Sequence, residues 1–144
     1  MTRFVPAFVL AIAAAALVVA DASAEIISFK AELSGANEVP AVEGDGKGTL
    51  TATYDTDTKT LTYKAEYTGM SGPVTAAHFH GPSDNAHNAP VLIPVSGGLA
   101  SPMQGSAVLT DAQAADLMGG RLYFNVHTAK LRPGEIRGQV VKGR

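Results

Sequence analysis

The sequence predicts an all-β fold, an antiparallel Greek-key sandwich or barrel of about eight strands with one short helix. Two segments, Gly48–Tyr54 and Thr60–Tyr67, alternate cleanly between apolar and polar side chains. Similar short segments recur along the chain, separated by glycine and proline residues. One segment has helix-capping residues at both of its ends. Together these observations favour a domain built from antiparallel strands.

The first three predicted strands are Ile26–Leu33, Gly48–Tyr54 and Thr60–Tyr67. In the second strand, leucine, alanine and tyrosine occupy one face, and threonines occupy the other. The third strand repeats this pattern, and period-two alternation rich in threonine and tyrosine is typical of a half-buried strand. The polar segment Asp55–Lys59 separates the two strands, so it predicts a hairpin turn.

Five further strands are expected later in the chain: Val74–His80, Val91–Val95, Ser106–Leu109, Arg121–His127 and Glu135–Val141. A short helix is predicted after the third of these, because Thr110 can cap it and Gln113 can complete a capping box. The pair Gly119-Gly120 then ends the helix. The apolar faces of the strands supply the candidate core residues: Leu50, Leu61, Tyr63, Phe79, Phe124 and Val126.

Residues 1–24 have the composition of a secretory signal peptide. Arg3 precedes an almost wholly apolar run, Phe4–Ala20, and Ala22-Ser23-Ala24 supplies the small-x-small pattern that signal peptidase accepts. A membrane span is the alternative, but the run is shorter than the roughly 20 residues that a spanning helix needs. We therefore expect cleavage after Ala24. The mature protein is then a single domain of residues 25–144, without a membrane span, in the periplasm or outside the cell.

Charge and composition exclude several classes of protein. The formal net charge at pH 7 is −2, which argues against a nucleic-acid-binding protein because such a protein needs a basic surface. The chain has no cysteine, so thiolate metal sites, cysteine nucleophiles and disulfides are excluded. The sequence has neither a serine nucleophile elbow nor a phosphate-binding glycine loop. Hydrolase chemistry therefore has little support, and whether the protein is an enzyme stays open.

The histidines are the most informative residues of the mature chain: His78, His80, His87 and His127. His78 and His80 are two residues apart on a predicted strand, so their side chains share one face, about 7 Å apart, opposite Phe79. The same alternation places His127 on the polar face of its own strand, away from the core. His87 falls in the loop after His80, where it could fold back over the others; a solvated loop histidine is the alternative.

Three or four imidazoles on outward faces predict a metal site. Neutral imidazole suits copper, zinc and nickel. Because no thiolate or carboxylate cluster accompanies the histidines, the favoured hypothesis is a copper ion bound by His78, His80 and His127, with His87 as a fourth ligand. Asp84 is the acidic residue of the histidine-rich loop, so a zinc site of histidine and aspartate is the competing hypothesis. Histidines with a purely structural role are the third.

Several separated motifs resemble the CHRD domain family, a module named from chordin and widespread in bacterial secreted proteins. They are Leu33–Pro40 (LSGANEVP), Ala77–Pro82 (AHFHGP), Tyr123–Thr128 (YFNVHT) and Pro133–Gln139 (PGEIRGQ). They occur in the family's order, and the resemblance covers residues 27–141. It implies a secreted β-domain and agrees with the outward-facing histidines that the strand pattern predicts.

The CHRD family is in turn similar to copper/zinc superoxide dismutase, an eight-stranded Greek-key sandwich with metal-binding histidines on its outer surface. By this resemblance, His78 and His80 match the dismutase His-x-His strand, His127 matches its late copper histidine, and His87 is a candidate for its bridging histidine. The sequence departs from that pattern because it has no second histidine cluster for zinc and no cysteine for the disulfide. Arg132 and Arg137 are candidates for the arginine that guides superoxide. The resemblance favours a mononuclear copper site over a complete dismutase.

The sequence therefore predicts a secreted or periplasmic β-sandwich that binds one copper ion and serves in copper binding or handling. A superoxide dismutase-like redox enzyme is the first alternative. An extracellular protein-interaction module without metal, as chordin's role implies, is the second. No nucleic-acid partner is expected, and no protein partner is indicated.

Overall fold

The structure, a computed structural model, describes residues 23–144. In this part the chain forms nine strands, one α-helix and one 3₁₀ turn. The strands are β1 (Ile26–Ser34), β2 (Lys47–Asp55), β3 (Thr60–Thr68), β4 (Val74–His80), β5 (Val91–Pro94), β6 (Met103–Val108), β7 (Tyr123–Thr128), β8 (Ile136–Gln139) and β9 (Val141–Lys142). The 3₁₀ turn is η1 (Gly35–Asn37), and the helix is α1 (Asp111–Met118). The predicted signal peptide falls almost wholly on residues 1–22, which lie outside the described part.

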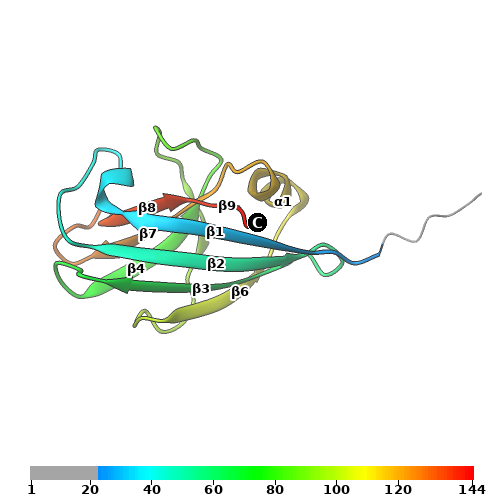
Figure 1. Ribbon diagram of the computed structural model, residues 1–144, viewed down its shortest axis with the longest axis horizontal. Helices are drawn as coiled ribbons and strands as arrows, with labels where there is room; N and C mark the ends of the chain where they lie inside the picture. Colours follow the sequence, from blue (N-terminus) through cyan, green and yellow to red (C-terminus); the bar gives the residue numbers. More distant parts are fainter. Residues whose placement is uncertain (1–22) are drawn as a thin grey trace, which may run out of the picture.

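The strands form one antiparallel sheet in the order β5-β4-β7-β8-β1-β2-β3-β6, and β9 pairs with β1 at its side. The chain crosses between distant positions of this order from β3 to β4, from β5 to β6 and from β6 to β7. Such crossings are typical of Greek-key connectivity rather than of a simple meander. Figure 1 shows the sheet curling on itself, so that β1, β2 and β3 lie in front of β4 and β7. The predicted all-β fold is confirmed.

The hydrophobic core lies between the two halves of the curled sheet. Tyr63 of β3 packs against Phe79 of β4 with ring centroids 5.0 Å apart, and Phe79 packs against Phe124 of β7 at 4.9 Å. The core residues that the alternation predicts are all buried: Leu50, Leu61, Tyr63, Phe79, Phe124 and Val126. This prediction is confirmed because side chains along a strand point alternately to its two faces.

The predicted hairpin and helix are both present. In the turn between β2 and β3, the Asp55 carboxylate accepts hydrogen bonds from the backbone N–H groups of Asp57 and Thr58, at 2.9 and 3.1 Å. At the start of α1, the Thr110 hydroxyl accepts from the Gln113 N–H, and the Gln113 side chain accepts from the Thr110 N–H. This is the predicted capping box. In residues 23–144 no helix is long and apolar enough to cross a membrane.

Most predicted strand ends lie within two residues of the observed ones, and two predicted strands differ by more. β6 begins at Met103 rather than at Ser106, because it pairs with β3 as far as Ala65. This pairing places Gly105 opposite Tyr63, whose side chain occupies the space that a side chain at position 105 would need. The last predicted strand divides into β8 and β9, because β8 pairs along β7 whereas β9 pairs with β1. In both cases the partner strand, rather than the local pattern, sets the boundary.

Replacing Phe79 with alanine should lower the free energy of unfolding by roughly 3–5 kcal/mol, because the ring is fully buried and its neighbours cannot fill the space it leaves. Chemical denaturation followed by far-UV circular dichroism measures this loss. Val108→Ala is the matched control: Val108 is 72 % exposed, and its loss should cost less than about 0.5 kcal/mol. Equal unfolding midpoints for the two variants would contradict the place of Phe79 in the core.

Candidate metal centre

The pairing of β4 with β7 brings three histidines to one face of the sheet. His78 and His80 lie on the face of β4 opposite the buried Phe79 side chain, as the alternation predicts. On the neighbouring β7, His127 occupies the same face, and the antiparallel register places it beside Ala76 of β4. The sheet itself therefore positions all three imidazoles.

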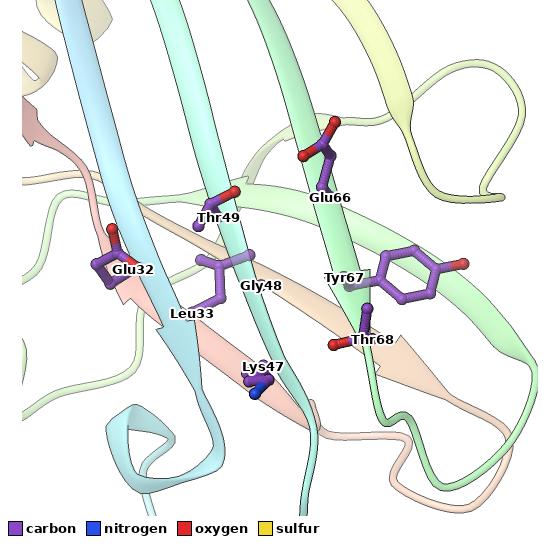
Figure 2. Close-up of a pocket in the computed structure, with 8 residues that line it drawn as sticks. All are labelled: Glu32, Leu33, Lys47, Gly48, Thr49, Glu66, Tyr67 and Thr68. Atoms are coloured by element: carbon purple, nitrogen blue, oxygen red, sulfur yellow. The ribbon is translucent and has the colours of Figure 1, made fainter.

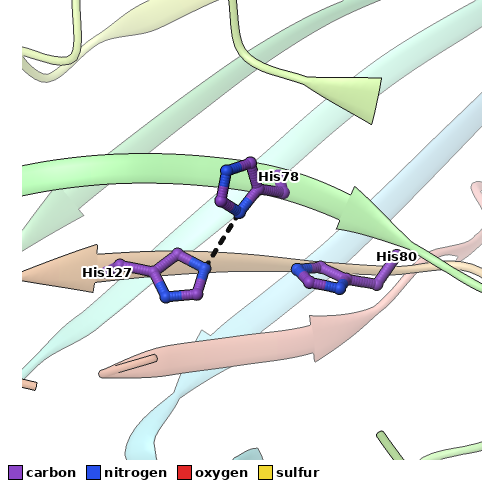
Figure 3. A group of neighbouring side chains, drawn as sticks. All are labelled: His78, His80 and His127. Carbon is purple, nitrogen blue, oxygen red and sulfur yellow. Dashed lines mark hydrogen bonds between the residues drawn. The ribbon is translucent and has the colours of Figure 1, made fainter. Parts of the chain in front are cut away.

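The three imidazoles are close enough to share one metal ion. One ligand nitrogen from each of His78, His80 and His127 lies within 4.8 Å of the others. His78 Nδ1 and His127 Nε2 lie 3.0 Å apart. Figure 3 shows the three rings gathered over β4 and β7. Within residues 23–144 this is the one group of at least three potential metal-ligating side chains that meets so closely.

Two backbone carbonyls fix which nitrogen is free on two of the rings. The Nδ1–H of His80 donates to the Ala89 carbonyl oxygen at 2.8 Å, and the Nδ1–H of His127 donates to the Arg132 carbonyl oxygen at 2.7 Å. A carbonyl oxygen only accepts, so in each neutral ring the proton is on Nδ1 and the lone pair is on Nε2. His80 Nε2 is buried without a hydrogen-bond partner. A metal-ligating histidine commonly has its second nitrogen held in this way.

His78 completes the set through its Nδ1 atom. Because His127 carries its proton on Nδ1, the contact between His78 Nδ1 and His127 Nε2 has His78 as the donor in the metal-free protein. A metal ion would take the place of that shared proton, with His78 protonated on Nε2 instead. Each of the three rings would then offer one unprotonated nitrogen, and such a donor set fits a metal ion with imidazole ligands.

The histidines lie on the outward faces of their strands, as the alternation predicts, but two of them are not open to solvent. They point away from the hydrophobic core, but His80 and His127 are only 8 % and 9 % exposed. The reason is tertiary: the loop between β4 and β5 supplies the acceptor for His80, and the loop between β7 and β8 supplies the acceptor for His127. Every residue of β7 is buried, because Phe124 and Val126 on its other face lie in the hydrophobic core. The two loops therefore cover His80 and His127, whereas His78 is half-buried.

Burial also favours the neutral form of two of the imidazoles. It lowers the pKa of His78 below its ordinary value, and the neighbouring His127 and His80 lower it further. Burial is the main cause of a lowered pKa at His80 as well, and the hydrogen bond to Ala89 acts in the opposite direction. Both shifts favour the uncharged ring at neutral pH, which is the form that binds metals.

His87, the expected fourth ligand, lies outside the three-histidine group. Its Nδ1 is 2.7 Å from the Asp84 carboxylate, and its side chain is 75 % exposed. The loop does fold back to His80, but it contacts that ring through the Ala89 carbonyl and leaves the His87 ring in solvent. Asp84, the ligand that a mixed zinc site would need, is held in the same exposed pair.

A layer of buried polar residues extends the site across β7 onto β8. Tyr123 and Asn125 share the face of β7 that carries His127, and Arg137 lies opposite Asn125 on β8. Glu38, from the segment after η1, is buried beside Asn125 and Arg137. In the sequence, Arg137 falls within the predicted strand Glu135–Val141, and Glu38 lies within the motif Leu33–Pro40. The period-two alternation of β8 is the signal that could have assigned Arg137 to this face.

One of the two arginines considered as guides for an anion is unsuited to that role. Arg137 is 1 % exposed, and its guanidinium donates to the Asn88 side chain and to two loop carbonyls. It has no surface to offer a substrate, so its assignment as an anion guide is wrong. Arg132 has an exposed side chain, and its backbone carbonyl is the one that holds His127.

A separate hollow lies on another part of the sheet. It has a volume of about 290 Å³ and is formed by β1, β2 and β3. Figure 2 shows its lining residues: Glu32, Leu33, Lys47, Gly48, Thr49, Glu66, Tyr67 and Thr68. It contains no histidine and no residue of β4 or β7, so it is not part of the candidate metal centre.

Fold and site together define the class of protein: an antiparallel Greek-key β-domain whose outer face carries a three-histidine centre beneath two loops. The family model of the CHRD domain matches residues 29–140. The chain therefore belongs to the CHRD domain family, as its motifs predict. Comparisons with curated proteins and with solved structures found no match.

Burial raises the pKa of Glu38 from 4.5 to about 7, although nearby Arg137 opposes part of this change. The folded protein therefore keeps a proton on Glu38 over a pH range in which the unfolded chain has lost it. This group's contribution to the free energy of unfolding falls as pH rises from about 4.5 to about 7. Glu38→Gln should remove this decrease, because glutamine does not ionise. The free energy of unfolding of the variant should therefore rise above that of wild type by up to about 3 kcal/mol between about pH 4.5 and pH 8.

Chemical denaturation at several pH values measures the effect of Glu38→Gln. Glu43→Gln, in an exposed residue of the same loop, is the matched control and should differ from wild type by less than about 0.5 kcal/mol throughout. Parallel stability profiles for wild type and Glu38→Gln would contradict the raised pKa.

Proposed function

We propose that this protein is a secreted or periplasmic CHRD domain that binds one copper ion through His78, His80 and His127 and serves in copper binding or handling. One observation carries the proposal. The ligand nitrogens of three imidazoles lie within 4.8 Å of one another, and backbone carbonyls hold two of the rings with Nε2 free. Because the sheet already orders these rings, little further ordering is needed when a metal binds.

The chemistry of the donors supports copper. All three are imidazole nitrogens, and copper(II) binds most strongly to such ligands among the common divalent ions. The zinc alternative relies on Asp84, but that carboxylate is exposed and hydrogen-bonded to His87. The three-histidine group contains no carboxylate. This set of ligands therefore favours copper over a mixed site of histidine and aspartate.

Bound copper would supply one-electron redox chemistry, and the chain's own residues define the surroundings. The carbonyls of Ala89 and Arg132 keep the protons of His80 and His127 on Nδ1, so each Nε2 offers its lone pair. Burial lowers the pKa of His78 and of His80. Protons therefore compete with a metal for these two rings only below the ordinary imidazole pKa of about 6.5. Copper affinity should fall as the pH drops below about 6.5.

The two alternative functions have less support. A dismutase-like enzyme needs an anion to reach the metal, but Arg137, one candidate guide, is buried and fully engaged with the loop. An interaction module without metal would leave the histidines with a structural role. The buried Nε2 of His80, however, has no structural partner. Both alternatives become outcomes of the experiments below.

Calorimetric titration should find one copper(II) ion per chain. His80→Ala and His127→Ala should each weaken binding by at least about 100-fold, because each removes a nitrogen ligand and not merely a supporting partner. Circular dichroism and thermal unfolding should show that both variants keep the fold, since these side chains lie outside the aromatic core.

His87→Ala is the matched control for the copper titration. It removes an exposed histidine outside the three-histidine group. Copper affinity should therefore stay within about threefold of wild type, a much smaller change than the loss of a ligand causes. Equal, weak affinity in wild type and His80→Ala would mean that the site does not exist, and the interaction module would then be favoured. Catalytic turnover of superoxide by the copper-loaded protein would favour the dismutase-like enzyme.

Export from the cytoplasm is the second part of the proposed function. CHRD domains occur in secreted or extracellular proteins, and the chain belongs to this family. N-terminal sequencing after expression of the whole chain in a bacterial host should find Glu25 as the first residue of protein in the periplasm or medium. A chain lacking residues 2–24 is the control and should stay in the cytoplasm. Recovery of membrane-bound protein that retains Met1 would contradict the proposal.

A further inference from the structure

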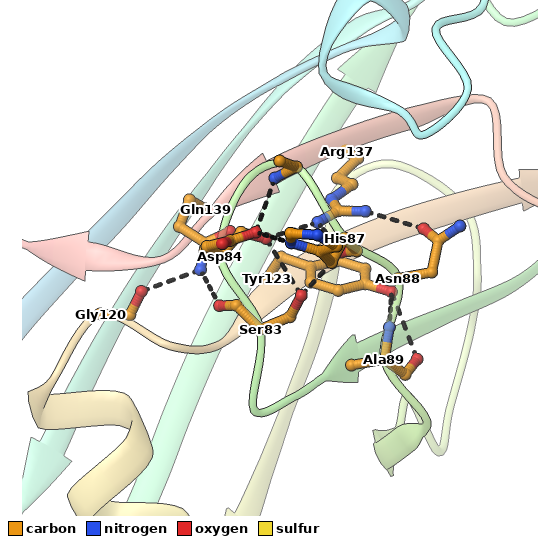
Figure 4. A network of polar contacts seen from close by, with 10 residues as sticks. Ser83, Asp84, His87, Asn88, Ala89, Gly120, Tyr123, Arg137 and Gln139 are labelled. Atoms are coloured by element: carbon orange, nitrogen blue, oxygen red, sulfur yellow. Dashed lines mark hydrogen bonds and ion pairs between the residues drawn. The ribbon is translucent and has the colours of Figure 1, made fainter.

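Arg137 is a buried cation that binds a single loop through three hydrogen bonds. Its Nη1 donates to the Asn88 side-chain oxygen at 2.9 Å, and its Nη2 donates to the carbonyl oxygens of Asp84 and His87 at 2.9 and 2.7 Å. All three acceptors lie between β4 and β5, in residues 81–90, as Figure 4 shows. A buried charge is costly unless it is hydrogen-bonded. The guanidinium therefore stabilises the conformation of the loop that satisfies it.

The same loop holds His80. Ala89 follows Asn88 directly in the chain, and its carbonyl oxygen accepts the Nδ1–H of His80 at 2.8 Å. The Ala89 N–H donates to the Tyr123 hydroxyl at 3.1 Å. A loop that moves away would therefore take with it the acceptor that keeps the His80 proton on Nδ1 and its Nε2 free.

Tyr123 forms a second connection between Arg137 and His80. Its ring stacks on the His80 ring with the planes 3° apart and the centroids 4.8 Å apart. The Arg137 Cζ lies 3.5 Å from the centroid of the same tyrosine ring. Because β7 lies between β4 and β8, Tyr123 has His80 on one side and Arg137 on the other. Cation–π contact and stacking thus hold the imidazole in its plane.

We propose that Arg137 is a positioning residue for the copper centre: it keeps the loop of residues 81–90 closed and, through Ala89 and Tyr123, holds His80 in its ligating orientation. This inference rests on the proposed function. Removing the supporting partners of metal ligands typically costs 10–100-fold in metal affinity. Because the loop also covers the site, loss of Arg137 should act mainly by speeding release of the metal.

Arg137→Lys tests this role because lysine keeps the positive charge but lacks the planar fork that reaches three acceptors. Copper affinity should fall by about 10–100-fold, with faster dissociation measured by transfer to a chelator. Electron paramagnetic resonance should show altered nitrogen coupling at copper(II), because His80 is no longer held in its plane. Arg121→Lys is the matched control: Arg121 is an exposed arginine bound to Asp116, and its copper affinity should stay within about twofold of wild type.

A measurement without metal tests the loop directly. Hydrogen–deuterium exchange of the metal-free protein should be at least about tenfold faster for loop amides in Arg137→Lys, with exchange in β1, β2 and β3 unchanged. Asn88→Ala removes one acceptor of the guanidinium from an exposed position. It should shift exchange and affinity in the same direction by a smaller amount, and it takes the place of Arg137→Lys if that variant does not fold.

The outcomes separate this inference from the proposed function. Wild-type protein that binds no copper would overturn the proposed function and the copper role of Arg137 with it. The role of Arg137 alone would be overturned if wild type binds copper and Arg137→Lys has unchanged copper affinity, spectrum and loop exchange. Asn88→Ala is judged by the same three measurements where it replaces Arg137→Lys. If the variant loses thermal stability but keeps wild-type copper affinity and spectrum, the role of Arg137 is purely structural. That result would also overturn the inference.

Discussion

The antiparallel pairing of β4 with β7 is the interaction on which both the core and the histidine site depend. One face of this pair supplies Phe79 and Phe124 to the aromatic core, and the opposite face gathers His78, His80 and His127. A slip of one residue in either strand would exchange the faces, because side chains alternate along a strand. Packing of the aromatic rings therefore sets the register that brings the imidazoles together.

Backbone carbonyls provide the second level of organisation. The sheet sets where the rings of His80 and His127 lie, and the loops that cover them set which nitrogen carries the proton. The loop between β7 and β8 is held in turn by Glu135, whose carboxylate accepts hydrogen bonds from the hydroxyls of Ser71 and Thr128. The loops thus do more than cover the histidines, because their conformation determines which ring nitrogens are available as ligands.

The polar layer beside the site carries an electrostatic cost. Arg137 is fully buried, and its guanidinium donates hydrogen bonds to neutral oxygens of the loop. Glu38 is the nearby carboxyl, and burial raises its pKa to about 7 even beside that cation. A protein core replaces such groups readily with apolar ones when only stability matters. Their presence beside the histidines fits a role in holding the candidate metal centre in one conformation.

Most of the fold, and part of the site, could be predicted because the evidence for them is local. Period-two alternation within Gly48–Tyr54 and Thr60–Tyr67 identifies the strands and the side chains that enter the core, and the spacing of His78 and His80 places both on one face. The capping box at Thr110 is likewise complete within a few residues. Strand boundaries such as the start of β6 were less predictable, because a partner strand sets them.

The sequence by itself determined which residues form strands, which side chains they bury and which histidines point outward, since each follows from the geometry of a single strand. Only the tertiary structure decided that His127 meets His78, its partner 49 positions away in the chain. It also decided that loops cover the site, that Asp84 holds His87 outside it and that Arg137 turns inward to bind the loop. These features depend on contacts between distant segments and on irregular loop backbone, which no local periodicity encodes.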